Sequence, residues 1–228
     1  LLNIILSCFT KMTNQSQKSG FQIENEIKTK AFQLPASKND TGIHDIPKDK
    51  NIFDPTENIS IKSTGSKTIC LGDARRIYSY DFRDKHTMVV YEYKQDNEYK
   101  KLKYIYEIDF NKKCHDLLFG DLPKEELDDY VRNVKSIPRK TKGKDAKRIF
   151  DYLNERDKLK EKYDFKIQIN PKVDSSQSRV QCSIPNFTET LKDYIIYKSN
   201  PDAPNMLRGR EIISHIKSNK RVRNNKLK

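Results

Sequence analysis

The tetrapeptide Ile59-Ser60-Ile61-Lys62 predicts a short strand with one apolar and one polar face. Side chains alternate along an extended strand, so Ile59 and Ile61 are expected to face a core while Ser60 and Lys62 point the other way. A lysine is rarely buried without a partner. A lysine at the edge of an apolar sheet therefore draws attention to the acidic residues around it.

Carboxylates stand on both sides of this strand in the sequence. Asp45, Asp54 and Glu57 precede it, and Asp73 follows at the end of the next apolar run. Carboxylates bind hard divalent cations, and a lysine can stabilise the charge that builds on a phosphate during hydrolysis. The pattern predicts a metal-dependent phosphodiesterase. The structural alternative is that Asp45 and Asp73 cap turns or helices, while Lys62 extends its ammonium group into solvent.

The overall charge points to a polyanionic partner. The 228 residues include 45 Lys and Arg against 32 Asp and Glu, which gives a net charge of +13. Phosphate contacts supply most of the non-specific affinity of proteins for nucleic acids. A basic protein without such a partner is the alternative. The length suits one domain, or a domain with appended lobes.

Cysteine usage and hydropathy bear on the compartment. The four cysteines, Cys8, Cys70, Cys114 and Cys182, form no C-x-x-C pair. They fit reduced thiols in the cytoplasm better than a disulfide framework or a zinc ribbon. The apolar run at residues 1–10 is too short to span a bilayer, so we expect a soluble protein with no membrane partner. We expect the native start at Met12 and read residues 1–11 as an extension, with a truncated signal segment as the alternative.

A helix is predicted near the start of the chain. It begins around Ser19, and Ile23, Ile27 and Ala31 form a stripe at helical spacing. Glu24 lies beside that stripe. It is either an outer ligand of the metal site or a solvated helix carboxylate.

Strand and turn signals predict the remaining elements. Residues 58–62 and 68–71 are expected to form a hairpin or a bent strand, and a short helix opens at Asp73. Residues 87–93 and 102–110 are expected to be paired strands. The second half is expected to contain, in order, a helix from Pro123, a longer helix around 146–153, a hairpin of residues 165–169 and 179–184, and helices at 188–197 and 208–218.

With these elements and residues, the stretch from about 20 to 110 resembles the PD-(D/E)xK nuclease superfamily, to which most type II restriction endonucleases belong. The resemblance implies that Lys62 is the motif lysine, Asp45 the first aspartate and Glu24 an assisting helix acid. Asp54 is the alternative first acid. Under this resemblance Asp45 and Asp73 would bind Mg²⁺, while Lys62 orients the attacking water or stabilises the transition state.

The chain departs from the family motif at Ser60, where a carboxylate is usual. Asp73 is the first candidate for the replacing acid, and Glu57 is the second. A site without activity is the other explanation of this departure.

Polar and basic residues in the second half are those expected of a DNA reader. Arg, Lys, Asn and Gln can pair with base edges in the major groove, which admits a two-stranded ribbon, whereas other cations contact phosphates and position the protein. A solvated hairpin face is the alternative. The base-reading candidates are Lys166, Gln168, Asn170, Lys172, Ser178, Arg179 and Gln181, and the phosphate-contacting candidates are Arg139, Lys140, Lys142, Lys144, Lys220, Arg221 and Arg223.

The expected architecture is an α/β, restriction-endonuclease-like mixed central sheet flanked by helices, with an added C-terminal hairpin and helices. We expect an extension at 1–18, a nuclease core at 19–120, a recognition part at 121–218 and a basic tail at 219–228. The expected function is Mg²⁺-dependent, site-specific cleavage of double-stranded DNA by a homodimer. The alternatives are a non-catalytic DNA-binding protein on a nuclease-like scaffold and a repair or junction nuclease of the same superfamily.

Overall fold

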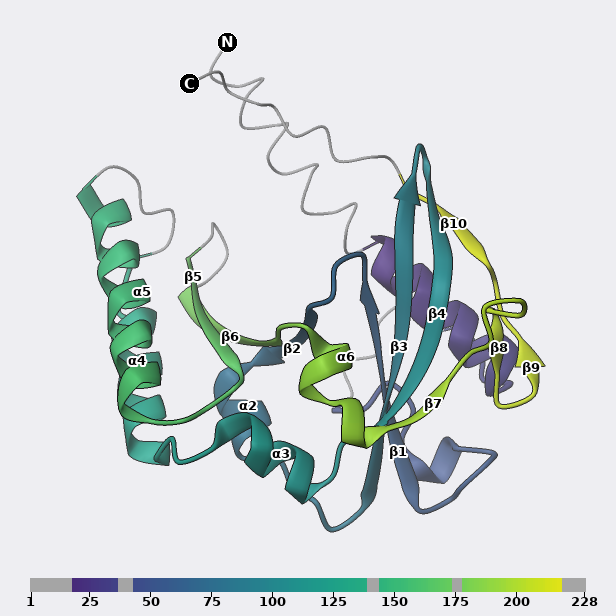
Figure 1. Ribbon diagram of the computed structural model, residues 1–228, viewed down its shortest axis with the longest axis horizontal. Helices are drawn as coiled ribbons and strands as arrows, with labels where there is room; N and C mark the ends of the chain where they lie inside the picture. The colour runs from purple at the N-terminus through teal and green to yellow at the C-terminus, as the bar shows by residue number, and fades with distance from the viewer. Residues whose placement is uncertain (1–17, 37–42, 139–143, 174–177, 219–228) are drawn as a thin grey trace. The chain divides into compact units, whose positions relative to one another are not determined.

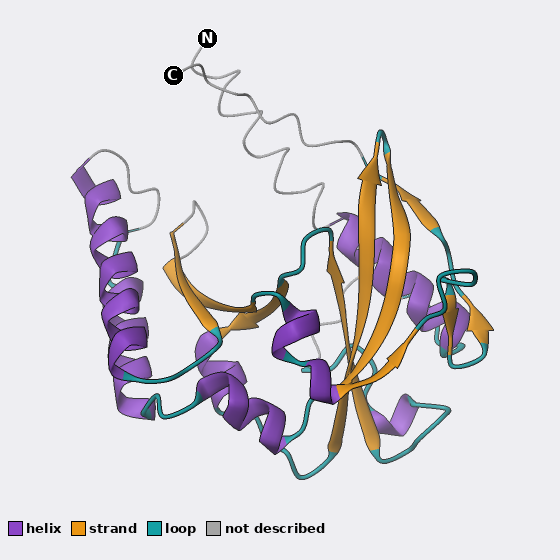
Figure 2. Cartoon of the chain, viewed as in Figure 1, coloured by secondary structure: helices purple, strands orange, loops and turns teal. Residues whose placement is uncertain are grey.

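The computed structural model describes residues 18–36, 43–138, 144–173 and 178–218. The fold is mixed α/β, with a curled sheet flanked by helices (Figures 1 and 2), which confirms the expected class at that level. The described residues form two compact units. The first contains residues up to 66, 87–108 and those from 195 onward, and the second contains 67–86 and 109–194. The units therefore alternate along the chain.

The first unit is built on a five-stranded sheet. Its main path runs β1-β3-β4-β10, and β7 also pairs with β4. β4 is antiparallel to both β10 and β7. The predicted strand pair at 87–93 and 102–110 is confirmed as β3 and β4, which flank a turn where Asn97 has a φ of 49°. The strands are β1 (Glu57–Thr64), β3 (Lys85–Asp96), β4 (Tyr99–Asp109), β7 (Ile195–Lys198) and β10 (His215–Lys217).

The predicted N-terminal helix is present. Residues 18–26 are α-helical, and a π-helical turn, η1 (Ile27–Ala31), continues them. The predicted stripe is buried and packs with Ile59 and Ile61 of β1, which are 0% and 7% exposed. This packing confirms that the two isoleucines of the tetrapeptide face the core.

The expected helix at 208–218 is wrong. Arg208 and Gly209 both have positive φ, 49° and 76°, and connect the short antiparallel strands β8 (Met206–Leu207) and β9 (Arg210–Glu211). The chain then continues as β10, which hydrogen-bonds to the edge of β4. Pairing with a strand far away in sequence outweighs the local helical spacing of apolar residues. The helix expected at 188–197 is shorter than predicted, because α6 (Phe187–Thr190) and η3 (Lys192–Tyr194) lead directly into β7.

The second unit contains a three-stranded antiparallel sheet with the order β2-β6-β5. The predicted hairpin is present as β5 (Gln168–Val173) and β6 (Ser178–Ile184), but its first strand covers 168–173 instead of the expected 165–169. The hairpin expected between residues 58–62 and 68–71 is wrong, because β2 (Ile69–Asp73) pairs with β6 rather than with β1. This pairing aligns the buried side chains of Ile69 and Ile184, so long-range apolar contact determines the partner of β2.

The helices of the second unit begin at local capping signals. Asp73 precedes α2 (Ala74–Tyr78) and accepts a hydrogen bond from the backbone N–H of Arg76 at 3.1 Å. Asn111 caps α3 (Lys112–Phe119) in the same way, and Pro123 precedes α4 (Lys124–Lys135), as predicted. The longer predicted helix is α5 (Lys144–Lys162). These helix starts follow from the sequence because each depends on adjacent residues.

Gly120→Ala is expected to destabilise the second unit. Gly120 has a φ of +51°, and an added Cβ would lie 1.7 Å from the carbonyl oxygen of Asp164. Strain of this kind costs about 2 kcal/mol. Chemical denaturation, monitored by circular dichroism, measures the loss of unfolding free energy. Gly20→Ala is the matched control, because nothing lies within 4 Å of a Cβ there and alanine favours a helix. Equal denaturation midpoints for the two variants would contradict the expectation.

Candidate active site

Asp45 and Lys62 meet beside strand β1, as their predicted shared role requires. Ile46 forms an antiparallel bridge with Ile59, so the residue before it lies alongside the strand. Asp45 Oδ2 accepts a hydrogen bond from the backbone N–H of Ile61 at 2.5 Å. The same oxygen lies 3.6 Å from Lys62 Nζ, and each side chain is 24% exposed. The pair is accessible to a ligand but partly shielded from water.

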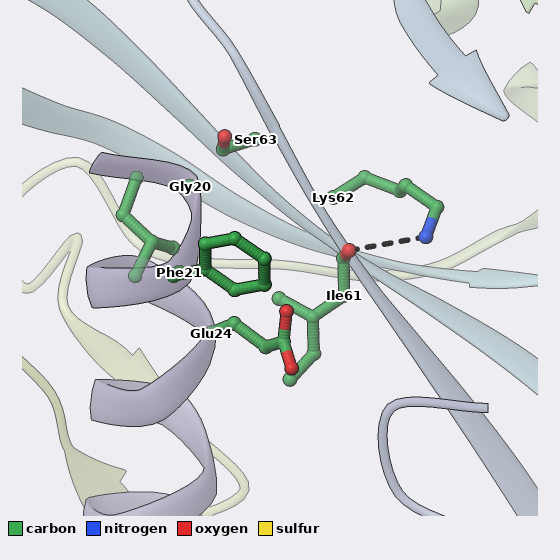
Figure 3. A pocket seen from close by; sticks show the side chains of 7 residues that line it. Gly20, Phe21, Glu24, Ile61, Lys62 and Ser63 are labelled. Carbon is green, nitrogen blue, oxygen red and sulfur yellow. Dashed lines mark hydrogen bonds between the residues drawn. The ribbon is translucent and has the colours of Figure 1, made fainter. Parts of the chain in front are cut away.

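The ammonium group of Lys62 occupies a point where two oxygens converge. Besides the Asp45 carboxylate, it contacts the carbonyl oxygen of Ile61, to which it donates a hydrogen bond of 3.2 Å (Figure 3). One charged and one neutral oxygen around a cation make a geometry that a hard metal ion also accepts. Asp45 and Ile61 could therefore each offer an oxygen to a cation beside Lys62.

Glu24 lines a cavity of about 220 Å³ together with Lys62. In Figure 3 it extends from the N-terminal helix over the side chain of Ile61. Glu24 Oε1 accepts a hydrogen bond of 2.6 Å from Lys28, a residue that is only 2% exposed. Lys28 therefore orients Glu24 at the cavity. The other lining residues are Gly20, Phe21, Ile23, Ile61 and Ser63.

The alternative acid Asp54 has a local structural contact. Its Oδ1 accepts hydrogen bonds from the backbone N–H and the hydroxyl of Thr56, at 2.9 and 2.6 Å. This is the geometry of an Asx turn leading into β1. These contacts support a turn-forming role for Asp54.

Glu57, the other alternative acid, belongs to a buried ion cluster that the sequence analysis missed. Arg208 donates to both oxygens of Glu57, at 2.7 and 3.1 Å, and to both oxygens of Glu107, with the shortest contact at 2.8 Å. The side chains of Arg208, Glu57 and Glu107 are 14%, 1% and 8% exposed. Thr87 and Asn51 also donate to Glu57, at 2.5 and 2.9 Å. Because each oxygen of Glu57 already accepts two hydrogen bonds, its carboxylate is better suited to holding the sheet than to binding a metal.

The electrostatics of this cluster follow from its geometry. Burial by itself would raise the pKa of Glu57, but the hydrogen bonds from Arg208 and Thr87 and the charge of Arg208 lower that pKa to about 2. Burial would lower the pKa of Arg208, and the two carboxylates raise it instead. Aromatic rings of Phe32 and Phe53 lie 5.5 Å from the guanidinium carbon. Arg208 and its two acids are far apart in the sequence, so no local pattern could have identified the cluster.

Asp73, the predicted second metal ligand, lies in the second unit, where it ends β2 and caps α2. Asp73 and Asp45, the two predicted metal ligands, therefore belong to different compact units. Among the described residues, no group of three or more His, Cys, Asp or Glu side chains is arranged to hold a metal ion. Serine remains where the family motif carries a carboxylate, and Ser60 is buried in β1.

The predicted DNA-contacting residues divide into two groups. Gln168, Lys172, Arg179 and Gln181 lie on the β5–β6 hairpin of the second unit, and Lys166 precedes β5. The basic residues predicted to contact phosphates, Arg139, Lys140, Lys142, Lys220, Arg221 and Arg223, lie outside the described residues.

No protein-family model, curated protein or solved structure matches this chain. The function of this chain is therefore inferred from the chemistry of its site. Within the part of the chain that the structure describes, no helix is both long and apolar enough to cross a bilayer.

Arg208→Met is expected to destabilise the first unit by about 3 kcal/mol, because it leaves two buried carboxylates without their cation. Urea denaturation of the variant and of the parent protein measures the difference. Arg83→Met is the control, because Arg83 pairs with Asp81 in solvent, at 88% and 54% side-chain exposure. Similar losses of unfolding free energy in the two variants would contradict a stabilising role for the buried cluster.

The cluster is also expected to make stability depend on acid pH. The pKa of Glu57 lies below its unfolded value of 4.5, so its contribution is present above pH 4.5 and is lost as the pH falls toward 2. The free energy of unfolding should therefore decrease as the pH is lowered from 4.5 toward 2. In Glu57→Gln this part of the decrease should be absent, and an unchanged acid profile would contradict the assignment.

Proposed function

We propose that this chain is a Mg²⁺-dependent endonuclease that cleaves double-stranded DNA at specific sites as a homodimer, in the manner of a type II restriction endonuclease. The observation that carries the proposal is the Asp45–Lys62 pair beside β1, with 3.6 Å between carboxylate and ammonium. A carboxylate and a lysine side by side, one from the bend before Ile46 and one from β1, supply two elements of metal-assisted phosphodiester hydrolysis. The net charge of +13 supports a polyanionic substrate.

The residues beside Lys62 fit a magnesium ion. Mg²⁺ is commonly held by one or two carboxylates, with waters and substrate phosphates completing an octahedral shell. Asp45 would provide one carboxylate, and the carbonyl of Ile61 a neutral oxygen. When bound, the ion would acidify a water and neutralise charge on the scissile phosphate. Glu24, fixed by Lys28, would face the same cavity as an assisting acid.

Lys62 has its own part in this chemistry. Its ammonium group, freed from the Ile61 carbonyl, would donate hydrogen bonds to the attacking water or to a phosphate oxygen. A preoriented cation stabilises the charge that develops in the transition state more than the charge of the ground state. Asp45 would keep the lysine directed toward the substrate.

The serine at position 60 supports one alternative function. If no acid replaces the missing carboxylate, the chain would be a non-catalytic DNA-binding protein on a nuclease-like scaffold. Asp73→Asn and Glu57→Gln, assayed separately, would distinguish the replacing acid from a structural one. The contacts of Glu57 lead us to expect that Glu57→Gln affects stability more than turnover.

Lys62→Ala is expected to reduce DNA cleavage at least about 10²-fold, because it removes a preoriented donor to the transition state. Supercoiled plasmid incubated with the protein and Mg²⁺, and resolved on agarose, measures the rate. Lys94→Ala is the control, since Lys94 is an exposed lysine of β3 and should leave the rate unchanged.

The pattern of plasmid products decides between the functions. Discrete fragments would support site-specific cleavage, and random nicks would support a repair-type nuclease. Plasmid that stays intact but shifts on a gel would refute catalysis and leave the binding protein. Full cleavage by Lys62→Ala would overturn the site assignment.

A further inference from the structure

One face of the β2–β6–β5 sheet in the second unit is made of polar side chains. In the antiparallel register of β5 and β6, residues directly opposite each other point to the same side. Three such rungs follow along the hairpin: Gln168 with Ser183, Asn170 with Gln181, and Lys172 with Arg179. On β2, Cys70 pairs with Ser183 and is exposed.

The opposite face of this sheet is closed by packing. Its side chains alternate with the polar ones and are buried, among them Ile169, Val180 and Ile184, each 0% exposed. α4 contacts β6 and α5 contacts β5, and both helices lie beside the sheet in Figure 1. On the polar face Ser183 is buried, Asn170, Gln181 and Arg179 are half-buried and Lys172 is exposed, so the outer part of this face is the part accessible to a partner.

The outermost of the three rungs on the polar face places two cations opposite each other. Lys172 is exposed, and Arg179 pairs with it across the hairpin. Like charges directly opposite on a sheet destabilise it. The buried Nε of Arg179 also has no hydrogen-bond partner among the described residues. The two adjacent cations indicate that this rung is suited to an anion, which would offset their mutual repulsion.

The middle rung is a pair of amides held in place. Arg156 donates to Asn170 Oδ1 at 2.9 Å, and Asn170 Nδ2 donates to Ser183 at 3.2 Å. Gln181 accepts from Lys172 at 3.2 Å and donates to the sulfur of Cys70. Each amide oxygen accepts two hydrogen bonds and each amide NH₂ donates two, so both side chains keep spare capacity while they are oriented.

We propose that this polar face reads base edges in the DNA major groove, with the Asn170–Gln181 rung on the bases and the Lys172–Arg179 rung on a phosphate. Asn and Gln match the donor and acceptor of adenine in that groove. Successive rungs are about 7 Å apart along a strand, so three rungs span roughly the 12 Å width of the groove. If the Asn170–Gln181 rung lies over the centre of the groove, the Lys172–Arg179 rung therefore lies near the phosphates at the groove edge.

The composition of the face favours DNA over other partners. A protein interface is expected to have aromatic or aliphatic anchors at its centre, and a surface for single strands needs exposed rings for stacking. The three rungs contain neither. The inference rests on the proposed function in taking duplex DNA as the substrate, and it adds which unit reads the sequence and with which side chains.

Binding measured without cleavage tests this inference. A pool of randomised duplexes is selected on the full-length protein in EDTA, and affinities for the enriched duplex and for the unselected pool are compared by fluorescence anisotropy. In the double variant Asn170→Ala, Gln181→Ala the ratio of these affinities should fall about tenfold or more. Lys172→Ala should weaken both affinities to a similar extent and reduce the salt dependence by about one phosphate contact.

Matched variants and separate readouts make the outcomes distinct. Asn133→Ala and Lys160→Ala, at exposed residues of α4 and α5, should change neither the affinity ratio nor the salt dependence of binding. An unchanged ratio in the double variant, with normal plasmid cleavage, would overturn the reading surface and leave the endonuclease standing. Cleavage lost in Lys62→Ala with the ratio intact would support both proposals. No enrichment of any duplex by the parent protein would overturn the reading surface.

Discussion

The buried ion cluster of Arg208 with Glu57 and Glu107 is the interaction on which the first unit depends. It joins the beginning of β1, the end of β4 and the turn between β8 and β9. A guanidinium in this position must be fully paired, because an unpaired buried charge costs several kcal/mol. Two carboxylates and two aromatic rings meet that requirement and hold the C-terminal segment against the sheet. The strand that carries Lys62 therefore begins at a fixed point.

The position of the candidate site depends on the course of β1. β1 is anchored through Glu57 at one end, and the bridge between Ile46 and Ile59 brings Asp45 to the middle of the strand. The carboxylate then accepts the N–H of Ile61, which brings it within 3.6 Å of the ammonium. The same anchoring that occupies the oxygens of Glu57 leaves Asp45 with room for a ligand. Glu57 on β1 and Asp45 beside it differ in the number of hydrogen-bond donors around each carboxylate, and this difference separates a structural acid from a candidate catalytic one.

Much of the fold could be predicted because its signals are local. The helix stripe at Ile23 and Ile27, the strand pair β3–β4 and the helix after Pro123 each depend on neighbouring residues. The partner of β2 and the strands after Arg208 could not be predicted, because each depends on residues far away in sequence. Local spacing at 208–218 even favoured the wrong element. Two positive φ angles and an open strand edge outweigh such weak helical periodicity.

The sequence by itself determined the strand of Ile59 and Ile61 and the candidate pair of Asp45 and Lys62. Alternation is enough for the strand, since it depends on residue type and spacing along the chain, whereas charge left several acids open and the resemblance to a nuclease family singled out Asp45. Only the tertiary structure decided that Glu57 is neutralised by Arg208 and that Asp73 caps a helix in another unit. The role of a carboxylate depends on which donors surround it, and those donors come from segments that only folding brings together.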